Sequence, residues 1–153
     1  MGMSNEDIAF EINNTDNKMI FLAGVFDDFQ MHNFAINNNY SYVAFDQFLI
    51  ENKITKEMFE NRANENKILI SIDRWTQRIA YKEQKGTVII DDFTPSKIES
   101  YLLRSLFMQD LIYLSKNNQK LITNIIFVVD MKHGALEEQV MPKVLDNSKI
   151  ISV

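Results

Sequence analysis

The chain has 153 residues, of which 46% are hydrophobic and 24% are charged, a composition typical of one globular domain. It has no cysteine, which excludes disulfides, a thiol nucleophile, and zinc or iron–sulfur sites with cysteine ligands. The formal net charge of −5 disfavours binding that is driven by phosphate backbones or anionic lipids. We therefore expect neither a nucleic-acid partner nor a membrane surface.

The start of the chain lacks the pattern of an export signal, because residues 4–7 are polar where such a signal becomes apolar. The longest apolar run, Ile125 to Val129, is far shorter than the roughly 20 residues of a membrane-spanning helix. We expect a cytoplasmic protein. Frequent asparagine and isoleucine are typical of an AT-rich genome, such as that of a low-GC bacterium or a virus.

The first third of the chain predicts a hairpin, an irregular loop and two short helices. Apolar residues alternate over 8–12 and return over 19–26, so we expect two paired strands around a polar turn at 13–17. Residues 27–42 have no clear period, and we expect an irregular surface loop there. Helices are expected at 43–51 and 55–64.

Three strands in quick succession are predicted for the middle of the chain, at 67–73, 77–82 and 87–91. The connection at 83–86 has the length of a hairpin turn and includes Gly86, which tolerates a positive φ. An antiparallel meander is the simplest interpretation of this order.

A long helix is predicted from Pro95 to Lys116, with Thr94 as its N-cap. Residues 123–130 are almost continuously apolar, as in a strand covered on both faces, so we place that strand in the centre of the sheet. A short helix at 134–141, which Pro142 breaks or restarts, and an edge strand at 150–151 follow.

These elements predict an α/β or α+β fold in a single domain that spans residues 1–153. Its sheet is expected to be a single mixed one, with an N-terminal hairpin and a central three-strand meander. The long apolar helix 95–116 is expected to pack on this sheet.

Four aspartates at predicted strand ends form a candidate metal site: Asp73, Asp91, Asp92 and Asp130. Converging carboxylates at the ends of parallel strands can hold Mg²⁺ or Mn²⁺ for phosphoester hydrolysis, with His133 as a proton carrier. The competing interpretation is that these aspartates end strands and begin helices. In a meander, the strand ends at Asp73 and Asp91 need not lie at the same edge.

Two resemblances extend the metal hypothesis. The order of elements over 55–130, with Asp73, Glu83 and Lys85, resembles the core of restriction-endonuclease-type nucleases. The resemblance implies a divalent ion on Asp73 and Glu83, with Lys85 stabilising negative charge. Residues 83–86 also fit an exposed turn.

The segment Thr87 to Asp92 resembles the Mg²⁺-side strand of P-loop nucleotide hydrolases, with 125–130 as the neighbouring strand. The chain has no Gly-x-x-x-x-Gly-Lys-Ser/Thr motif, which excludes an active NTPase of this type. The sequence is still compatible with a chain that keeps this fold but no longer binds a nucleotide. His32 and His133 are isolated, so we expect no histidine-based metal site.

The helix at 95–116 has more apolar residues than one buried face requires, because they cover most of its circumference between 98 and 114. The surplus is covered within the domain, by a second copy or by another protein. Aromatic and methionine residues, which are enriched in contact surfaces, also gather between 21 and 42. The residues that we expect to bind a partner are Tyr101, Leu103, Phe107, Leu111, Leu114, Phe29, Met31 and Phe34.

The sequence is compatible with two functions, of which only the second is enzymatic. The first is a non-enzymatic protein–protein interaction module without a cofactor, which binds a protein partner or itself within a larger bacterial or viral assembly. The alternative is a phosphoesterase or nuclease that depends on Mg²⁺ or Mn²⁺.

Overall fold

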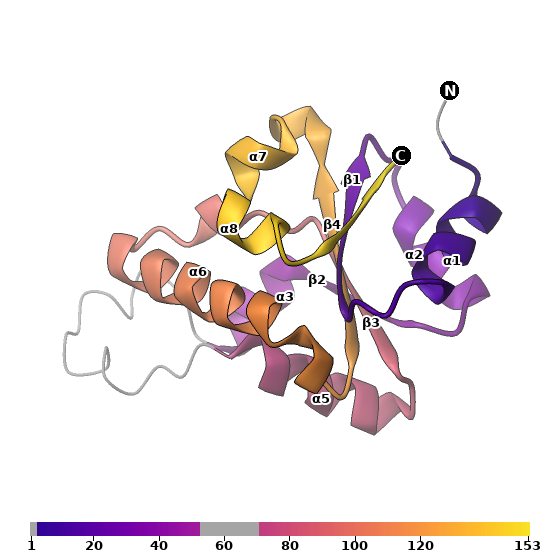
Figure 1. Ribbon diagram of the computed structural model, residues 1–153, viewed down its shortest axis with the longest axis horizontal. Helices are drawn as coiled ribbons and strands as arrows, with labels where there is room; N and C mark the ends of the chain where they lie inside the picture. Colours follow the sequence, from indigo (N-terminus) through magenta and orange to yellow (C-terminus); the bar gives the residue numbers. More distant parts are fainter. Residues whose placement is uncertain (1–2, 53–70) are drawn as a thin grey trace.

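The computed structural model describes residues 3–52 and 71–153, which form an α/β fold around one five-stranded parallel sheet. The strand order is β2-β3-β4-β1-β5. The strands are β1 (Met19–Gly24), β2 (Ser41–Ala44), β3 (Thr87–Asp91), β4 (Asn124–Asp130) and β5 (Lys149–Ser152). All carboxyl ends therefore lie at one edge of the sheet, uppermost in Figure 1.

Helices cover both faces of this sheet, and alternate strand residues supply two separate cores. Phe21, Val88 and Phe127 point to the core beneath the later helices, whereas their neighbours Leu22 and Ile89 point to the other core. The first face is covered by α3 (Phe45–Glu51), α5 (Ile72–Glu83), α6 (Tyr101–Lys116), α7 (Leu136–Gln139) and α8 (Pro142–Leu145). The second is covered by α1 (Asn5–Asn13) and α2 (Gln30–Asn37), on the opposite side of the sheet in Figure 1.

Several predicted elements are confirmed. Strand β4 lies in the middle of the sheet with its five inner residues buried, and β3 and the edge strand β5 lie where they were expected. Helix α3 falls within 43–51. Pro142 separates α7 from α8 by starting the second helix, because a missing N–H costs nothing at that position.

The predicted N-terminal hairpin is wrong, because residues 5–13 form α1 instead of a strand. The side chain of Ser4 accepts a hydrogen bond from the Asp7 N–H and caps the helix. Ile8 and Ile12 are buried at helical spacing, whereas Phe10 between them is 65% exposed. An alternating pattern contains an i, i+4 pair, and here the helical period prevails.

The irregular loop predicted for 27–42 is also wrong, since this segment holds α2 and the start of β2. Met31, Phe34 and Ala35 form the buried side of α2 against the second core. The helix predicted at 55–64 and the start of the strand predicted at 67–73 lie outside the described residues.

The three-strand meander is wrong as well. Residues 77–82 belong to α5, which buries Ile72, Thr76 and Ala80 at intervals of four and is capped by Ser71. A parallel sheet requires a crossover between neighbouring strands, and α5 is part of the connection from β2 to β3.

The long helix starts later than predicted. Pro95 opens a single 3₁₀ turn, η2 (Pro95–Lys97), and Ser100 caps α6 by accepting from the Leu103 N–H. Helix α6 then runs to Lys116, as expected. None of the described helices is long and apolar enough to cross a membrane.

Candidate functional site at the carboxyl edge of the sheet

The chain changes direction across the sheet between β1 and β4, which are neighbours. After β1 the chain crosses to β2 at one edge, and after β4 it passes to β5 at the other. In open parallel sheets, ligands bind at such a switch point, outside the carboxyl ends of the strands. The loops after β1, β3 and β4 therefore define the candidate site.

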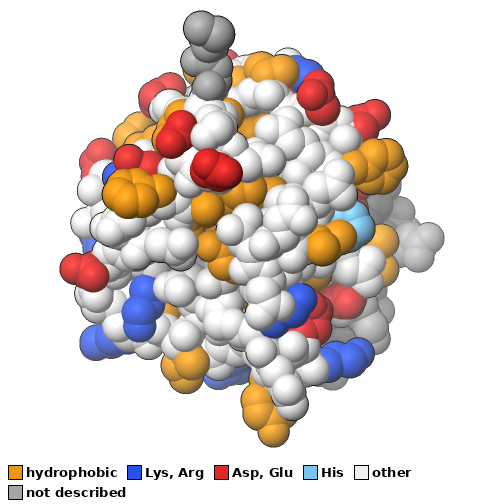
Figure 2. Space-filling model, turned by 90° about the vertical axis from the view of Figure 1, so that its right-hand side faces the viewer, with side chains coloured by type: hydrophobic (Ala, Val, Ile, Leu, Met, Phe, Trp, Pro, Cys, Tyr) orange, Lys and Arg blue, Asp and Glu red, His pale blue; other side chains and the backbone are white. Residues whose placement is uncertain are grey.

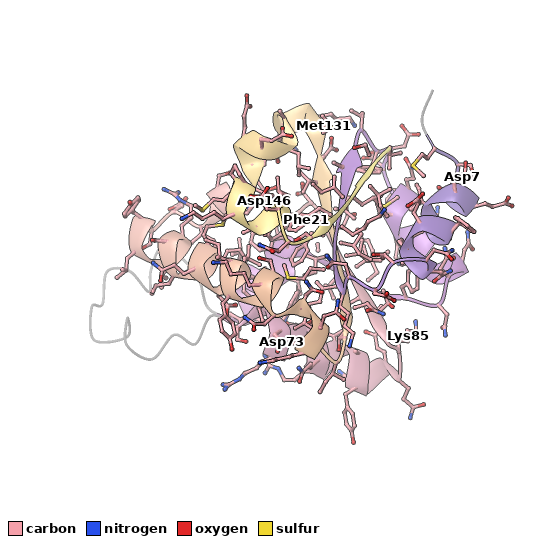
Figure 3. The ribbon with its side chains drawn as sticks, in the orientation of Figure 1. Asp7, Phe21, Asp73, Lys85, Met131 and Asp146 are labelled. Carbon is pink, nitrogen blue, oxygen red and sulfur yellow. The ribbon has the colours of Figure 1, made fainter. Side chains whose placement is uncertain are left out.

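These loops enclose a hollow of about 320 Å³ that we call the acidic hollow. Met131, labelled at the upper end of the molecule in Figure 3, directly follows β4 beside it. The lining residues are Phe26, Asp27, Asp28, Phe29, Met31, Tyr42, Asp91, Asp92, Asp130 and Lys132. Five carboxylates and one ammonium group thus face a space at the position where a nucleotide hydrolase of the resembled type holds phosphate.

Hydrogen bonds within the chain occupy two of these carboxylates. Asp91 Oδ2 accepts from the Tyr42 hydroxyl at 2.5 Å, and Asp91 Oδ1 accepts from the N–H of Asp92 at 2.8 Å. Partial burial, together with the bond to Asp91, raises the pKa of Tyr42 well above its ordinary value. Asp130 Oδ1 accepts from the Lys132 N–H at 2.9 Å and caps a 3₁₀ turn.

A third carboxylate, Asp92, belongs to an exposed ion-pair group. Its Oδ2 lies 2.9 Å from Lys97 Nζ, which also lies 3.0 Å from Asp46. His133 Nε2 is 3.9 Å from Asp92 Oδ1. The backbone of Asp92 has a φ of 51°, which aspartate adopts more readily than most residues.

The four aspartates predicted to bind metal do not meet. Asp91, Asp92 and Asp130 lie near the acidic hollow, but Asp73 is in the first turn of α5, far from Met131 at the other end of the molecule in Figure 3. Within 3–52 and 71–153, no three histidine or carboxylate side chains form a group that could hold a metal ion. The geometry that this hypothesis needs is absent from that part of the chain.

The nuclease resemblance also fails in the structure. Asp73 and Glu83 lie in the first and last turns of one helix, α5, and Lys85 follows that helix in the turn before β3. The resemblance requires Glu83 and Lys85 on one face of a strand, and neither residue lies in a strand.

The P-loop resemblance is confirmed in one respect, since β3 and β4 pair as neighbours. The connection from β1 to α2 has the strand–loop–helix form of a phosphate loop, but its residues differ. Counted from Gly24, the positions of the second glycine, the lysine and the Ser/Thr hold Phe29, Gln30 and Met31.

Gly24 itself is explained by packing. A Cβ atom at this position would lie 2.9 Å from Val153 Cβ and 3.3 Å from the Phe26 ring. The Val153 N–H donates to the Ala23 carbonyl at 2.8 Å, which holds this segment against β1. The glycine therefore serves the contact with Val153.

Phe29 is the unusual residue of this edge. Its φ of 64° is left-handed, and the residue is 75% exposed. Val25, in the same loop, is 62% exposed. An L-residue in this conformation costs about 1–2 kcal/mol, and an exposed aromatic ring gains nothing from burial. The loop thus presents an aromatic side chain that directly follows two aspartates, Asp27 and Asp28.

The residues predicted to bind a partner divide into two groups. Six of them are buried in the two cores, so other parts of the same domain cover them: Leu103, Phe107, Leu111, Leu114, Met31 and Phe34. Tyr101, at 78% exposure, and Phe29 remain on the surface. The outer side of α6 also exposes Leu102, Leu106 and Tyr113, which the prediction did not include.

Four neighbours of the strand-end aspartates were not predicted from the sequence: Asp27, Asp28, Tyr42 and Lys132. The available signal was the pair Asp27-Asp28 shortly after the apolar run 19–26, which would be read as a strand end in a parallel sheet. No protein-family model matches the sequence, and no similar sequence is found among curated proteins.

Proposed function

We propose that this chain is a non-enzymatic protein–protein interaction module, a subunit or accessory factor of a larger bacterial or viral assembly. The observation that carries the proposal is Phe29, an aromatic side chain held exposed in a left-handed conformation at the switch point of a parallel sheet. Aromatic side chains of this kind supply the main binding energy of many protein interfaces.

The acidic hollow supports binding to protein over binding to phosphate. Asp27 and Asp28 place negative charge where a phosphate loop presents backbone N–H groups and a lysine. The hydrogen bonds of Asp91 and Asp130 within the chain hold these carboxylates in place.

The test replaces Phe29 with the photocrosslinking analogue benzoylphenylalanine in the expressed chain and irradiates its native cellular extract. Phe10 provides the matched control, because it is also an exposed phenylalanine, at 65%, but lies on α1. We expect one discrete protein adduct at position 29, identified by mass spectrometry, and none of that protein at position 10.

Binding of the identified protein is then measured with purified components. Phe29→Gly is expected to weaken it at least tenfold, because the substitution removes the aromatic ring and keeps the backbone conformation. The same adducts at both positions, or unchanged affinity in Phe29→Gly, would contradict the proposal.

A further inference from the structure

A second hollow, of about 720 Å³, lies at the amino edge of the sheet, and we call it the amino-edge hollow. The end of α5, the turn before β3 and the segment before β4 enclose it. Tyr81 and Ile122 stand at its rim with 89% and 81% of their side chains exposed.

The charge of this hollow is opposite to that of the carboxyl edge. Lys82 and Lys85 line it, and no carboxylate is among its described lining residues. Hydrogen bonds from Gln47 and Trp75 are the main causes of the lowered pKa of Glu51, and the charge of Lys82 adds a smaller part. Lys85 forms no ion pair with any described residue. Lys82 forms no ion pair with a described residue either, so both lysines are available; Lys85 is labelled at the lower right of Figure 3.

The two edges carry different charge on the visible surface too. On the face shown in Figure 2, most carboxylates lie in the upper half and most lysines and arginines in the lower half. On this face the basic side chains thus lie mostly toward the amino edge of the sheet.

We propose that the 25–29 loop of one copy docks in the amino-edge hollow of a second copy. The aromatic ring of Phe29 would contact the apolar surface of Tyr81 and Ile122, and Asp27 and Asp28 would lie near Lys85. This inference rests on the proposed function and names its partner as the chain itself. The two surfaces are complementary in shape and in charge: the loop has an exposed ring preceded by two aspartates, and the hollow has apolar surface and two lysines.

The geometry determines the type of assembly. The loop and the hollow lie at opposite edges of one sheet, so each copy contacts one neighbour with each edge. Such heterologous contacts form rings if they close and filaments if they do not. One loop in one hollow is smaller than the roughly 1,600 Å² of a standard interface, so the association is expected to be weak, with a dissociation constant of about 1–100 µM.

The experiment is sedimentation velocity on the purified chain and on pairs of variants. The parent chain is expected to form larger species as its concentration rises, and about tenfold higher salt is expected to weaken this association about tenfold or more. Phe29→Gly removes the ring from the loop, and Lys85→Glu reverses the charge of the hollow. Each variant alone is expected to stay monomeric.

An equimolar mixture of the two variants distinguishes this contact from all others. Phe29→Gly keeps an intact hollow and Lys85→Glu keeps an intact loop, so the mixture is expected to form dimers and nothing larger. Tyr81→Ser, which changes an exposed side chain, is a second hollow variant with the same expectation. Phe10→Ser is the matched control and is expected to associate like the parent, and melting curves confirm that each variant is folded.

A monomeric parent chain, a monomeric mixture, or variants that each still associate alone would overturn the inference. A photo-adduct of residue 29 with a different protein would also overturn it but would leave the proposed function standing. With no adduct of residue 29 at all, both would fail.

Discussion

At the scale of single residues, the carboxyl edge of the sheet has two residues in a backbone conformation that residues other than glycine rarely adopt. Phe29 and Asp92 both have positive φ, and neither is glycine. The cost is smaller for Asp92, because aspartate adopts positive φ more readily than most residues, and larger for Phe29. A costly conformation that persists at a switch point of the sheet is typical of a site with a function.

The strain at Phe29 can be measured by comparing two substitutions that both remove its ring. We expect Phe29→Gly to be more stable than Phe29→Ala by about 1 kcal/mol, because only glycine adopts a φ of 64° without steric cost. Urea unfolding of both variants provides the measurement. Equal stabilities would show that this loop relaxes when the ring is removed.

Gly24 has a different requirement, which is close approach. We expect Gly24→Ala to destabilise the chain by about 1–3 kcal/mol, because its Cβ would lie 2.9 Å from Val153 Cβ. In a Val153→Gly background the cost is expected to fall, since the atom that clashes is gone. Four melting curves form this double-mutant cycle, and purely additive effects would refute the explanation.

At the scale of elements, the sequence predicted those strands and helices whose pattern has one interpretation. The continuous apolar run of β4 and the proline at the start of α8 are such patterns, and both are confirmed. The pattern at Ile8 and Ile12 fits both a strand and a helix, and 77–82 is ambiguous in the same way. The caps at Ser4 and Ser71 and the packing against the two faces of the sheet decided these cases.

Helix α6 is predicted to contribute stability mainly through one face. Phe107 is fully buried and packs near the rings of Phe45, Phe48 and Phe93, whereas Tyr113 is 62% exposed. We expect Phe107→Ala to cost about 3–5 kcal/mol and Tyr113→Ala to change stability by less than about 0.5 kcal/mol. Urea unfolding distinguishes these values, and similar costs would mean that α6 is not packed as described.

The contact between α6 and α5 is predicted to depend on pH. Burial raises the pKa of Asp110 to about 6; the backbone N–H of Ile72 opposes this shift and the charge of Asp73 adds to it. Among the described residues, Asp110 Oδ2 has no hydrogen-bond partner. Because the pKa is higher in the folded chain than in the unfolded one, this carboxyl destabilises the fold as the pH rises from about 4 to about 6.

Asp110→Asn therefore tests this contact. We expect the variant to be more stable than the parent by about 1 kcal/mol at pH 7, a value reduced for the solvent that reaches the side chain, and to have no such advantage at pH 4. Thermal unfolding across this range measures the difference. An advantage that is the same at both values of pH would contradict the assignment to Asp110.

At the scale of the whole molecule, the class of the fold could be predicted from the sequence, but the direction of the strands could not. Strand β1 pairs with β4 and β5, which both follow it by more than a hundred residues, and no local pattern indicates such a partner. The candidate site depends on direction, because only parallel strands bring Asp27, Asp91 and Asp130 to one edge. Asp91, Asp92 and Asp130 could be predicted because each directly follows or ends an apolar run. Asp27 and Asp28 could not, because their place beside these residues depends on the direction of β1.

The carboxyl edge as a whole is predicted to reject phosphate. We expect that ATP or GTP with Mg²⁺ produces no saturable rise in the melting temperature, because a bound ligand stabilises a fold by mass action and these loops offer carboxylates to the phosphates. Gln30 also stands where the lysine of the motif would bind. A saturable rise would show that the edge binds nucleotide despite its charge.

The position of β1 between β4 and β5 also has a consequence for how the chain folds during synthesis. Both of its partners come from the last third of the sequence, so β1 leaves the ribosome long before either can pair with it. Its six residues, all buried in the folded chain, have unpaired backbone groups and exposed apolar side chains during that time. Pairing over such long sequence separations slows folding and exposes a chain to aggregation. The strand that leads into the loop with Phe29 is therefore also one that needs protection before folding is complete.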